Sequence, residues 1–115
     1  MYDYNIVRPD ECEFIEVASQ DELDDGERLF IEVDDIQIVL FKIAEKYFAI
    51  GDVCSHDDGP LGDGNIEEFN VTCPRHGAQF DVRTGKALSL PAIVDIPAYP
   101  VRVEDNNIEI GFPTK

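Results

Sequence analysis

Short apolar runs separated by turn residues constrain the fold of this chain more than any other feature. Three runs rich in β-branched and aromatic residues follow one another, at 28–33, 36–43 and 46–50. Asp34 and Asp35 separate the first two, as expected for the tip of a hairpin. No stretch has the length and helical periodicity that a βαβ unit needs. The pattern predicts an all-β fold, an antiparallel sandwich or barrel.

The remaining elements continue this pattern. A short helical turn is predicted over 19–23, with Glu22 at the capping-box position. A hairpin with Asn106 and Asn107 at its tip is expected near the C-terminus. Residues 51–64 contain four glycines and a proline and are predicted to form a loop. Further short strands are expected at 14–18, 67–72 and 78–82 and on both sides of the C-terminal tip, and residues 83–88 are predicted to form a turn into another strand.

The chain is strongly acidic. Its 115 residues include 25 acidic and 9 basic ones, which gives a formal net charge of -16. This charge disfavours nucleic acid and anionic membranes as partners, and it favours a protein with a basic docking patch. The length fits a single domain over 1–115, and no secretory signal is recognisable. Three cysteines are too few for a disulfide scaffold, so a cytoplasmic protein with reduced thiols is expected.

Both histidines of the chain lie close behind cysteines. One residue separates Cys54 from His56, and two residues separate Cys73 from His76. Two thiolates and two imidazoles form a four-ligand set that suits one zinc ion or a [2Fe–2S] cluster. The one-residue gap of the first pair is unusual for zinc sites, but ligand count alone leaves both interpretations open.

The residues around these pairs resemble the cluster-binding loops of Rieske-type [2Fe–2S] proteins. The resemblance rests on CSH at 54–56 and CPRHGAQFDVRTGKAL at 73–88, and it continues through YPVRVEDN at 99–106. It covers roughly residues 12 to 112. It implies a Rieske (ISP-like) antiparallel β-sandwich or barrel base, into which a small cluster-binding subdomain of two loops is inserted at about 51–89.

The resemblance also implies which residues bind the cluster. Cys54 and Cys73 would bind the inner iron as thiolates, and His56 and His76 would bind the outer iron near the surface. Neutral imidazoles in place of two thiolates make the site less negative, which raises its potential above that of all-cysteine clusters. The outer histidine edge is then the expected exit for an electron.

Departures from the respiratory Rieske proteins indicate the subclass. Those proteins carry an extra cysteine in each loop, joined as a disulfide, where this chain has Gly59 and Arg75. High-potential members also place serine and tyrosine hydroxyls near the cluster sulfurs, where this chain has Ala78 and Phe80. Fewer hydrogen-bond donors to sulfur predict a low potential within the Rieske range.

The resemblance is greatest to the Rieske-type ferredoxins of ring-hydroxylating dioxygenase systems. It implies a soluble one-electron carrier, not itself an enzyme, that takes electrons from an NAD(P)H-dependent flavin reductase and passes them to a terminal oxygenase. The alternatives are a small Rieske subunit of a larger reductase, such as assimilatory nitrite reductase, and a structural zinc module. A nucleophilic pair of Cys73 and His76 would leave Cys54 and His56 without a role.

Several neighbouring residues have supporting roles in this interpretation. Residues 60–61 are expected to cover the cluster, and Asp57 and Asp58 to add negative charge to the docking face. Gly77 is expected to adopt a backbone conformation that a side chain would obstruct. Cys12 is expected to be a small structural thiol.

Overall fold

The chain is built almost entirely of antiparallel strands. The computed structural model describes residues 12–53, 61–74, 77–89 and 95–113. Within these ranges it contains ten strands and one three-residue 3-10 helix, so the predicted all-β class is confirmed. No helix in the same ranges is long and apolar enough to cross a membrane.

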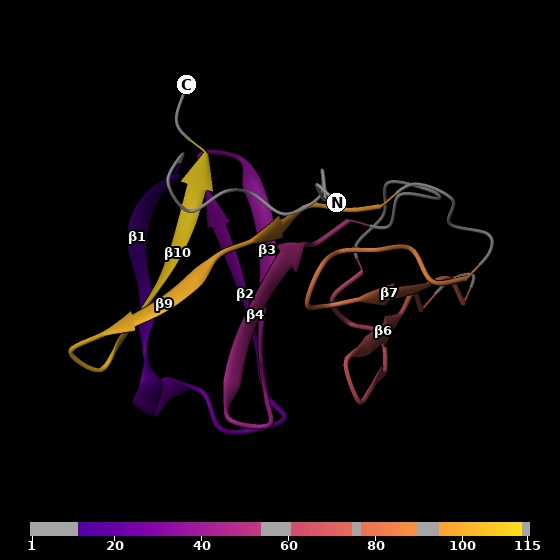
Figure 1. Ribbon diagram of the computed structural model, residues 1–115, viewed down its shortest axis with the longest axis horizontal. Helices are drawn as coiled ribbons and strands as arrows, with labels where there is room; N and C mark the ends of the chain where they lie inside the picture. Colours follow the sequence, from indigo (N-terminus) through magenta and orange to yellow (C-terminus); the bar gives the residue numbers. More distant parts are fainter. Residues whose placement is uncertain (1–11, 54–60, 75–76, 90–94, 114–115) are drawn as a thin grey trace.

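The strands form three sheets (Figure 1). The first has the order β1-β10-β9, the second β2-β3-β4-β8 and the third β5-β6-β7. The first two make a base, and the third is a small sheet on one side of it, to the right in Figure 1. The bounds are β1 (Cys12–Ser19), β2 (Arg28–Val33), β3 (Ile36–Ile43), β4 (Lys46–Gly51), β5 (Ile66–Glu67), β6 (Asn70–Thr72), β7 (Gln79–Asp81), β8 (Ala98–Tyr99), β9 (Val101–Glu104) and β10 (Asn107–Pro113), with the 3-10 helix η2 (Gln20–Glu22) after β1.

The middle strand β3 is buried on both faces. Ile38 and Leu40 belong to the core shared by the two base sheets, whereas Val39 and Phe41 belong to a second core that includes residues of the small sheet. Side chains alternate across a strand, so one continuous apolar run supplies both cores. Each fully buried side chain of this size contributes roughly 1.5–3 kcal/mol.

The two cores contain residues from different parts of the structure. The base core contains Ala18, Leu23, Ile38, Leu40, Ala49, Ile108, Ile110 and Phe112. The second core joins the middle sheet to the small sheet and to the segment that returns to β8. It contains Val39, Phe41, Ile50, Leu61, Val71, Cys73, Ala78, Phe80, Val82, Ile96 and Ala98.

The predicted hairpins of the base are confirmed. β2 and β3 have the predicted bounds, and the turn residues Asp34 and Asp35 have positive φ of 50° and 67°, as two-residue hairpin turns require. The C-terminal tip is one residue earlier than predicted, at Asp105 and Asn106. The predicted helical turn is the helix η2, and the Glu22 carboxylate accepts a hydrogen bond of 2.9 Å from the backbone N–H of Ser19.

In the second half of the chain one strand prediction was wrong, one was only partly right, and one strand was missed. Residues 66–72 form the hairpin β5–β6 and not one strand, because Glu68 takes a positive φ of 55° and reverses the chain. The turn predicted over 83–88 is present at its start, but the described residues that follow it form only an isolated bridge from Ala87 to Phe80. The short strand β8 was missed because prolines flank it in the sequence, yet it pairs with β4.

Candidate metal centre

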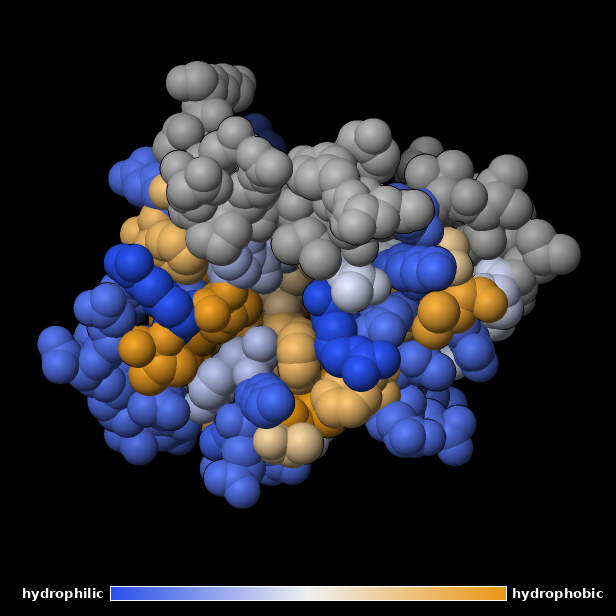
Figure 2. Space-filling view, viewed as in Figure 1, coloured by the Kyte–Doolittle hydropathy of each residue, from blue (hydrophilic) through white to orange (hydrophobic). Residues whose placement is uncertain are grey.

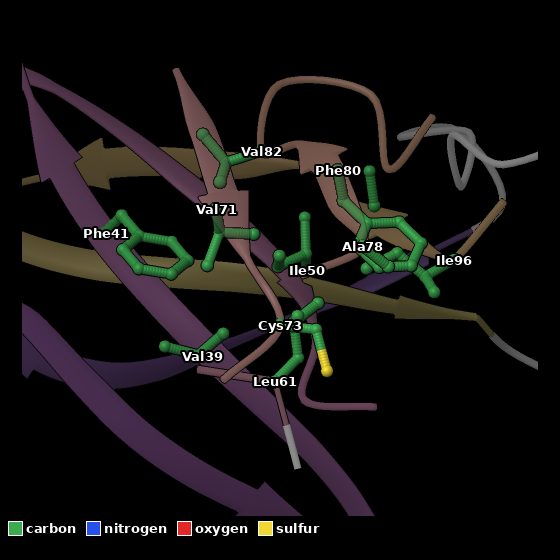
Figure 3. Close-up of a cluster of buried hydrophobic side chains, with 11 residues drawn as sticks. Val39, Phe41, Ile50, Leu61, Val71, Cys73, Ala78, Phe80, Val82 and Ile96 are labelled. Atoms are coloured by element: carbon green, nitrogen blue, oxygen red, sulfur yellow. The ribbon is translucent and has the colours of Figure 1, made fainter. Parts of the chain in front are cut away.

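Cys73 lies at the end of β6, where the small sheet meets the middle sheet. Its side chain is 1% exposed and packs in the second core beside Leu61 (Figure 3). The backbone N–H of Cys73 donates to the carbonyl of Ala78 (2.7 Å), and the N–H of Gly77 donates to the carbonyl of Cys73 (3.0 Å). These bonds join Cys73 to Gly77 and Ala78, so the backbone of Cys73 is held at the end of the small sheet.

Gly77 has the backbone conformation that the sequence suggested. Its φ is +78°, and no atom lies within 4 Å of the place where a Cβ would be. The obstruction is therefore conformational, since L residues with a side chain rarely adopt this φ. The turn after Cys73 can close as it does because residue 77 is a glycine.

A hollow of about 400 Å³ opens beside the Cys73 thiol. It lies between the small sheet and the turn before β5, and its lining residues are Asp63, Gly64, Asn65, Thr72, Cys73, Pro74 and Gly77. A thiolate is a soft ligand that suits an iron–sulfur cluster. Cys73 is the one predicted ligand among the described residues, and its chemistry and the hollow beside it fit a [2Fe–2S] cluster.

The other predicted ligands, Cys54, His56 and His76, lie outside the described residues, as do Asp57, Asp58, Gly59, Pro60 and Arg75. Among the residues that are described, no three His, Cys, Asp or Glu side chains gather as a metal site. Leu61, predicted to cover the cluster, is fully buried next to Cys73. Cys12 lies in β1, in the sheet that contributes no residue to the second core.

An ion pair holds the turn that follows β7. The Arg83 guanidinium binds the Asp81 carboxylate at 2.9 Å, and its Cζ lies 4.5 Å from the ring centroid of Phe69. Burial raises the pKa of Asp81, but hydrogen bonds and charge from Arg83 outweigh burial and leave the pKa below its ordinary value.

Burial raises the pKa of Tyr99 in β8.

Sequence reasoning missed two polar residues near the site. Arg28 donates to backbone carbonyls of the turn at 61–64, and Asp52 accepts from backbone N–H groups of the same turn. Arg28 begins a base strand far away in sequence, so no local pattern connects it to the turn. The glycines at 62 and 64 were the available signal, because closely spaced glycines often mark a close backbone approach.

Comparison with known proteins decides the family. The family model described as "Rieske [2Fe-2S] domain" matches residues 13–100. The chain belongs to the Rieske [2Fe–2S] domain family. The predicted cofactor is thereby confirmed as a [2Fe–2S] cluster, while the assignment of its four ligands stays a prediction.

Relatives within the family are named as ferredoxins. The 3-phenylpropionate/cinnamic acid dioxygenase ferredoxin subunit of Escherichia coli (strain K12) is 41% identical over 90 residues, which is 77% of this chain and 84% of that protein. The solved ferredoxin of carbazole 1,9a-dioxygenase from Nocardioides aromaticivorans IC177 is 30% identical, with a TM-score of 0.80 over 88% of this chain and 98% of that chain. This Rieske protein is accordingly an electron carrier of the ferredoxin type and not itself an enzyme.

The same fold occurs in a protein of another kind. A structure from Mycobacterium tuberculosis, assigned as the small subunit of an NADH-dependent nitrite reductase, has a TM-score of 0.80 over 90% of this chain and 98% of that chain. Its sequence identity is 22%, so the likeness shows the fold alone.

Substitution of Gly64 by alanine is expected to disturb the Cys73 site. A Cβ at Gly64 would lie 1.7 Å from the carbonyl oxygen of Thr72, so either the turn or the end of β6 must move. We expect the free energy of unfolding to fall by about 3 kcal/mol in urea titration. Gly26→Ala is the control, since Gly26 has a φ of +88° but nothing within 4 Å of a Cβ, and it should cost only about 1 kcal/mol. Equal losses in the two variants would contradict the steric explanation.

Proposed function

We propose that this ferredoxin passes single electrons from an NAD(P)H-dependent flavin reductase to a terminal ring-hydroxylating oxygenase in the cytoplasm. The observation that carries the proposal is the 41% identity to a dioxygenase ferredoxin subunit over 84% of its length. The cluster, when bound, supplies the chemistry by accepting and releasing one electron. The protein holds it, sets its potential and presents it to partners.

The proposed ligands are Cys54 and Cys73 for the inner iron and His56 and His76 for the outer iron, within a cluster-binding subdomain at about 51–89. The burial of the described residues next to the Cys73–His76 pair supports the assignment of cysteine to the inner iron and histidine to the outer iron. Cys73 is buried, whereas Pro74 and Gly77, on either side of 75–76 in the sequence, are exposed. The change from a buried Cys73 to an exposed Pro74 suits an inner thiolate that is followed in sequence by an outer imidazole.

Mixed ligation can be tested at His76. The reduced wild-type protein should give an EPR spectrum with a low average g value, typical of a cluster with cysteine and histidine ligands. His76→Cys should make the reduction potential more negative because a thiolate adds negative charge, and His76→Ala should lose the cluster. Cys12→Ser is the control and should leave the spectrum unchanged, because Cys12 lies in β1. A colourless protein with stoichiometric zinc, or an unshifted cluster in both His76 variants, would refute the assignment.

The residues after the second pair support a low potential. Ala78 and Phe80 are fully buried in the second core, and neither side chain can donate a hydrogen bond to a cluster sulfur. In high-potential Rieske proteins these positions carry hydroxyl groups that stabilise the reduced cluster. This chain therefore leaves its reduced state less stabilised.

Restored hydroxyls should raise the potential. Ala78→Ser and Phe80→Tyr are each expected to shift it positively by about 1 kcal/mol, roughly 40 mV for a one-electron couple, as measured by protein-film voltammetry. Phe69→Tyr adds the same hydroxyl to a residue beside β6 that packs against the edge of the second core, and it should leave the potential unchanged. A wild-type potential as positive as that of respiratory Rieske proteins would contradict the proposal.

The acidic surface supports docking to a basic patch on each partner. The net charge is -16, and hydrophilic side chains cover much of the described surface in Figure 2. Asp63 is exposed and lines the hollow beside Cys73, so negative charge lies close to the proposed cluster. Such charge raises the rate of encounter with a basic partner and does little for the final affinity.

Electron transfer to the oxygenase should therefore slow as ionic strength rises. In stopped-flow mixing of the reduced ferredoxin with its terminal oxygenase, Asp63→Asn should lower the second-order rate constant about threefold at low salt. Asp105→Asn is the matched control, because Asp105 is an exposed aspartate at the β9–β10 tip, at the opposite end of the molecule from the small sheet (Figure 1). A rate that does not change with salt, or equal effects of the two variants, would argue against electrostatic docking at this face.

A small subunit of a larger reductase is the second candidate, because the nitrite reductase small subunit shares the fold. The two candidates differ in the state of the isolated chain. A ferredoxin is stable on its own and cycles reversibly between its redox states, whereas a subunit remains bound to its large partner.

A further inference from the structure

The turn formed by residues 61–64 lies between the two predicted ligand pairs. It closes with a hydrogen bond from the N–H of Gly64 to the carbonyl of Leu61 (3.0 Å). Leu61 is fully buried beside Cys73 in the second core (Figure 3). The turn therefore shares a core with Cys73, and its residues Asp63 and Gly64 line the same hollow as Cys73. Cys54 and His56 precede it in the sequence.

Asp52 binds the N–H groups of this turn. One carboxylate oxygen, Oδ1, accepts from Leu61 (2.9 Å) and from Gly62 (2.7 Å). The backbone N–H of Asp52 donates to the carbonyl of Gln37 on the middle sheet (2.9 Å). The carboxylate thus joins the end of β4 to the residues that follow 53–60, and two bonds to a charged acceptor are strong ones.

Arg28 binds the carbonyl groups of the same turn. Its Nη1 donates to the carbonyl of Gly62 and to that of Gly64, the latter at 2.6 Å. The guanidinium lies over the ring of Phe41, with Cζ 5.4 Å from the centroid, and Arg28 pairs with Phe41 across β2 and β3. Arg28 is therefore fixed on the base by its contact with Phe41, and it hydrogen-bonds the turn from there.

The glycines let the turn approach its neighbours closely. A Cβ at Gly62 would lie 2.6 Å from the Phe30 ring and 3.1 Å from the Asp52 carboxylate, and one at Gly64 would meet the Thr72 carbonyl. Thr72 directly precedes Cys73, and its N–H donates to the carbonyl of Asn65 (2.9 Å). Contacts therefore run from the base through the turn to the Cys73 end of β6.

We propose that Arg28 and Asp52 form a clamp on the turn at 61–64 and act as positioning residues that fix the spacing of the two ligand pairs and so retain the cluster. The proposal rests on the proposed function for the identity of the ligands. The Asp52 carboxylate accepts hydrogen bonds from N–H groups of the turn, and the Arg28 guanidinium donates hydrogen bonds to its carbonyl groups. The turn is therefore bound through both its donors and its acceptors. Arg28 belongs to β2 of the base, and Asp52 directly follows β4 and donates its N–H to Gln37 of β3, so the base sets where the turn lies.

The test removes each half of the clamp and measures how long the full-length protein keeps its cluster. Arg28→Met and Asp52→Ala should each shorten the half-life of visible absorbance in the presence of EDTA by about tenfold. Arg28→Lys and Asp52→Asn keep a donor or an acceptor and should recover most of that loss. Their EPR spectra should also be narrower than those of Arg28→Met and Asp52→Ala, because fixed ligands give one cluster geometry.

Two matched controls separate the clamp from general stability. Arg102→Met removes a guanidinium that lies over Phe14 at 4.2 Å and pairs with Glu109, in the sheet away from the site. Asp25→Ala removes a carboxylate that accepts the N–H of Glu45 at 2.6 Å in a base hairpin. Both should keep the half-life within about twofold of wild type. Half-lives that follow the urea stability of all the variants alike would overturn the proposal, as would unchanged half-lives in Arg28→Met and Asp52→Ala.

Hydrogen–deuterium exchange of the peptide that contains 61–64 tests the clamp without reference to the ligands. Exchange should be faster in Arg28→Met and Asp52→Ala than in wild type and the two controls. Unchanged exchange would show that the clamp does not hold the turn. A wild-type protein that contains zinc in place of iron would instead refute the proposed function, and the exchange result would still stand.

Discussion

Burial of the β2-β3-β4-β8 sheet on both faces is the constraint on which the rest of the structure depends. One face packs in the base core, and the other face packs in the second core against the small sheet and Cys73. β3 supplies both faces through alternation, with Ile38 and Leu40 on one side and Val39 and Phe41 on the other. A polar side chain at any of these positions would therefore disturb the base or the cluster-binding half directly. The position of the thiol depends on the packing of a sheet that carries no proposed ligand of its own.

The sequence predicted the parts of the fold that rest on local patterns. The bounds of β2 and β3 and the turn at Asp34 and Asp35 follow from β-branched residues interrupted by turn formers. The hairpin at Glu68 was not predicted, because glutamate is not a usual turn residue and its positive φ comes from the surrounding sheet. β8 was missed for a similar reason, since its pairing with β4 is a tertiary contact that outweighs the flanking prolines.

The site shows the same division between local and long-range information. The spacing of cysteines and histidines is local, so the sequence alone indicated the family, which the family model confirms, and it predicted a ligand set, which stays a prediction. The hydrogen bonds of Arg28 to the turn at 61–64 span 34 and 36 residues, and no spacing rule predicts them. Asp52 lies closer in sequence, but within a glycine-rich loop a single aspartate is easily interpreted as a solvated residue. A ligand set can thus be predicted from short motifs, whereas long-range contacts such as those of Arg28 become visible only once the sheets are assembled.

The pairing of β1 with β10 has a consequence for how such a domain can be used. Cys12 and Pro113, at the two ends of the described chain, are partners in the base sheet that takes no part in the second core. Entry and exit points that lie side by side let a domain be inserted into a longer polypeptide, or be rejoined in permuted order, with little strain. Either change would leave the Cys73 hairpin and the β2-β3-β4-β8 sheet intact. The fold is thus suited to serve as a transplantable module, because the sheet that contains Cys12 and Pro113 supplies no residue to the second core or to the hollow beside Cys73.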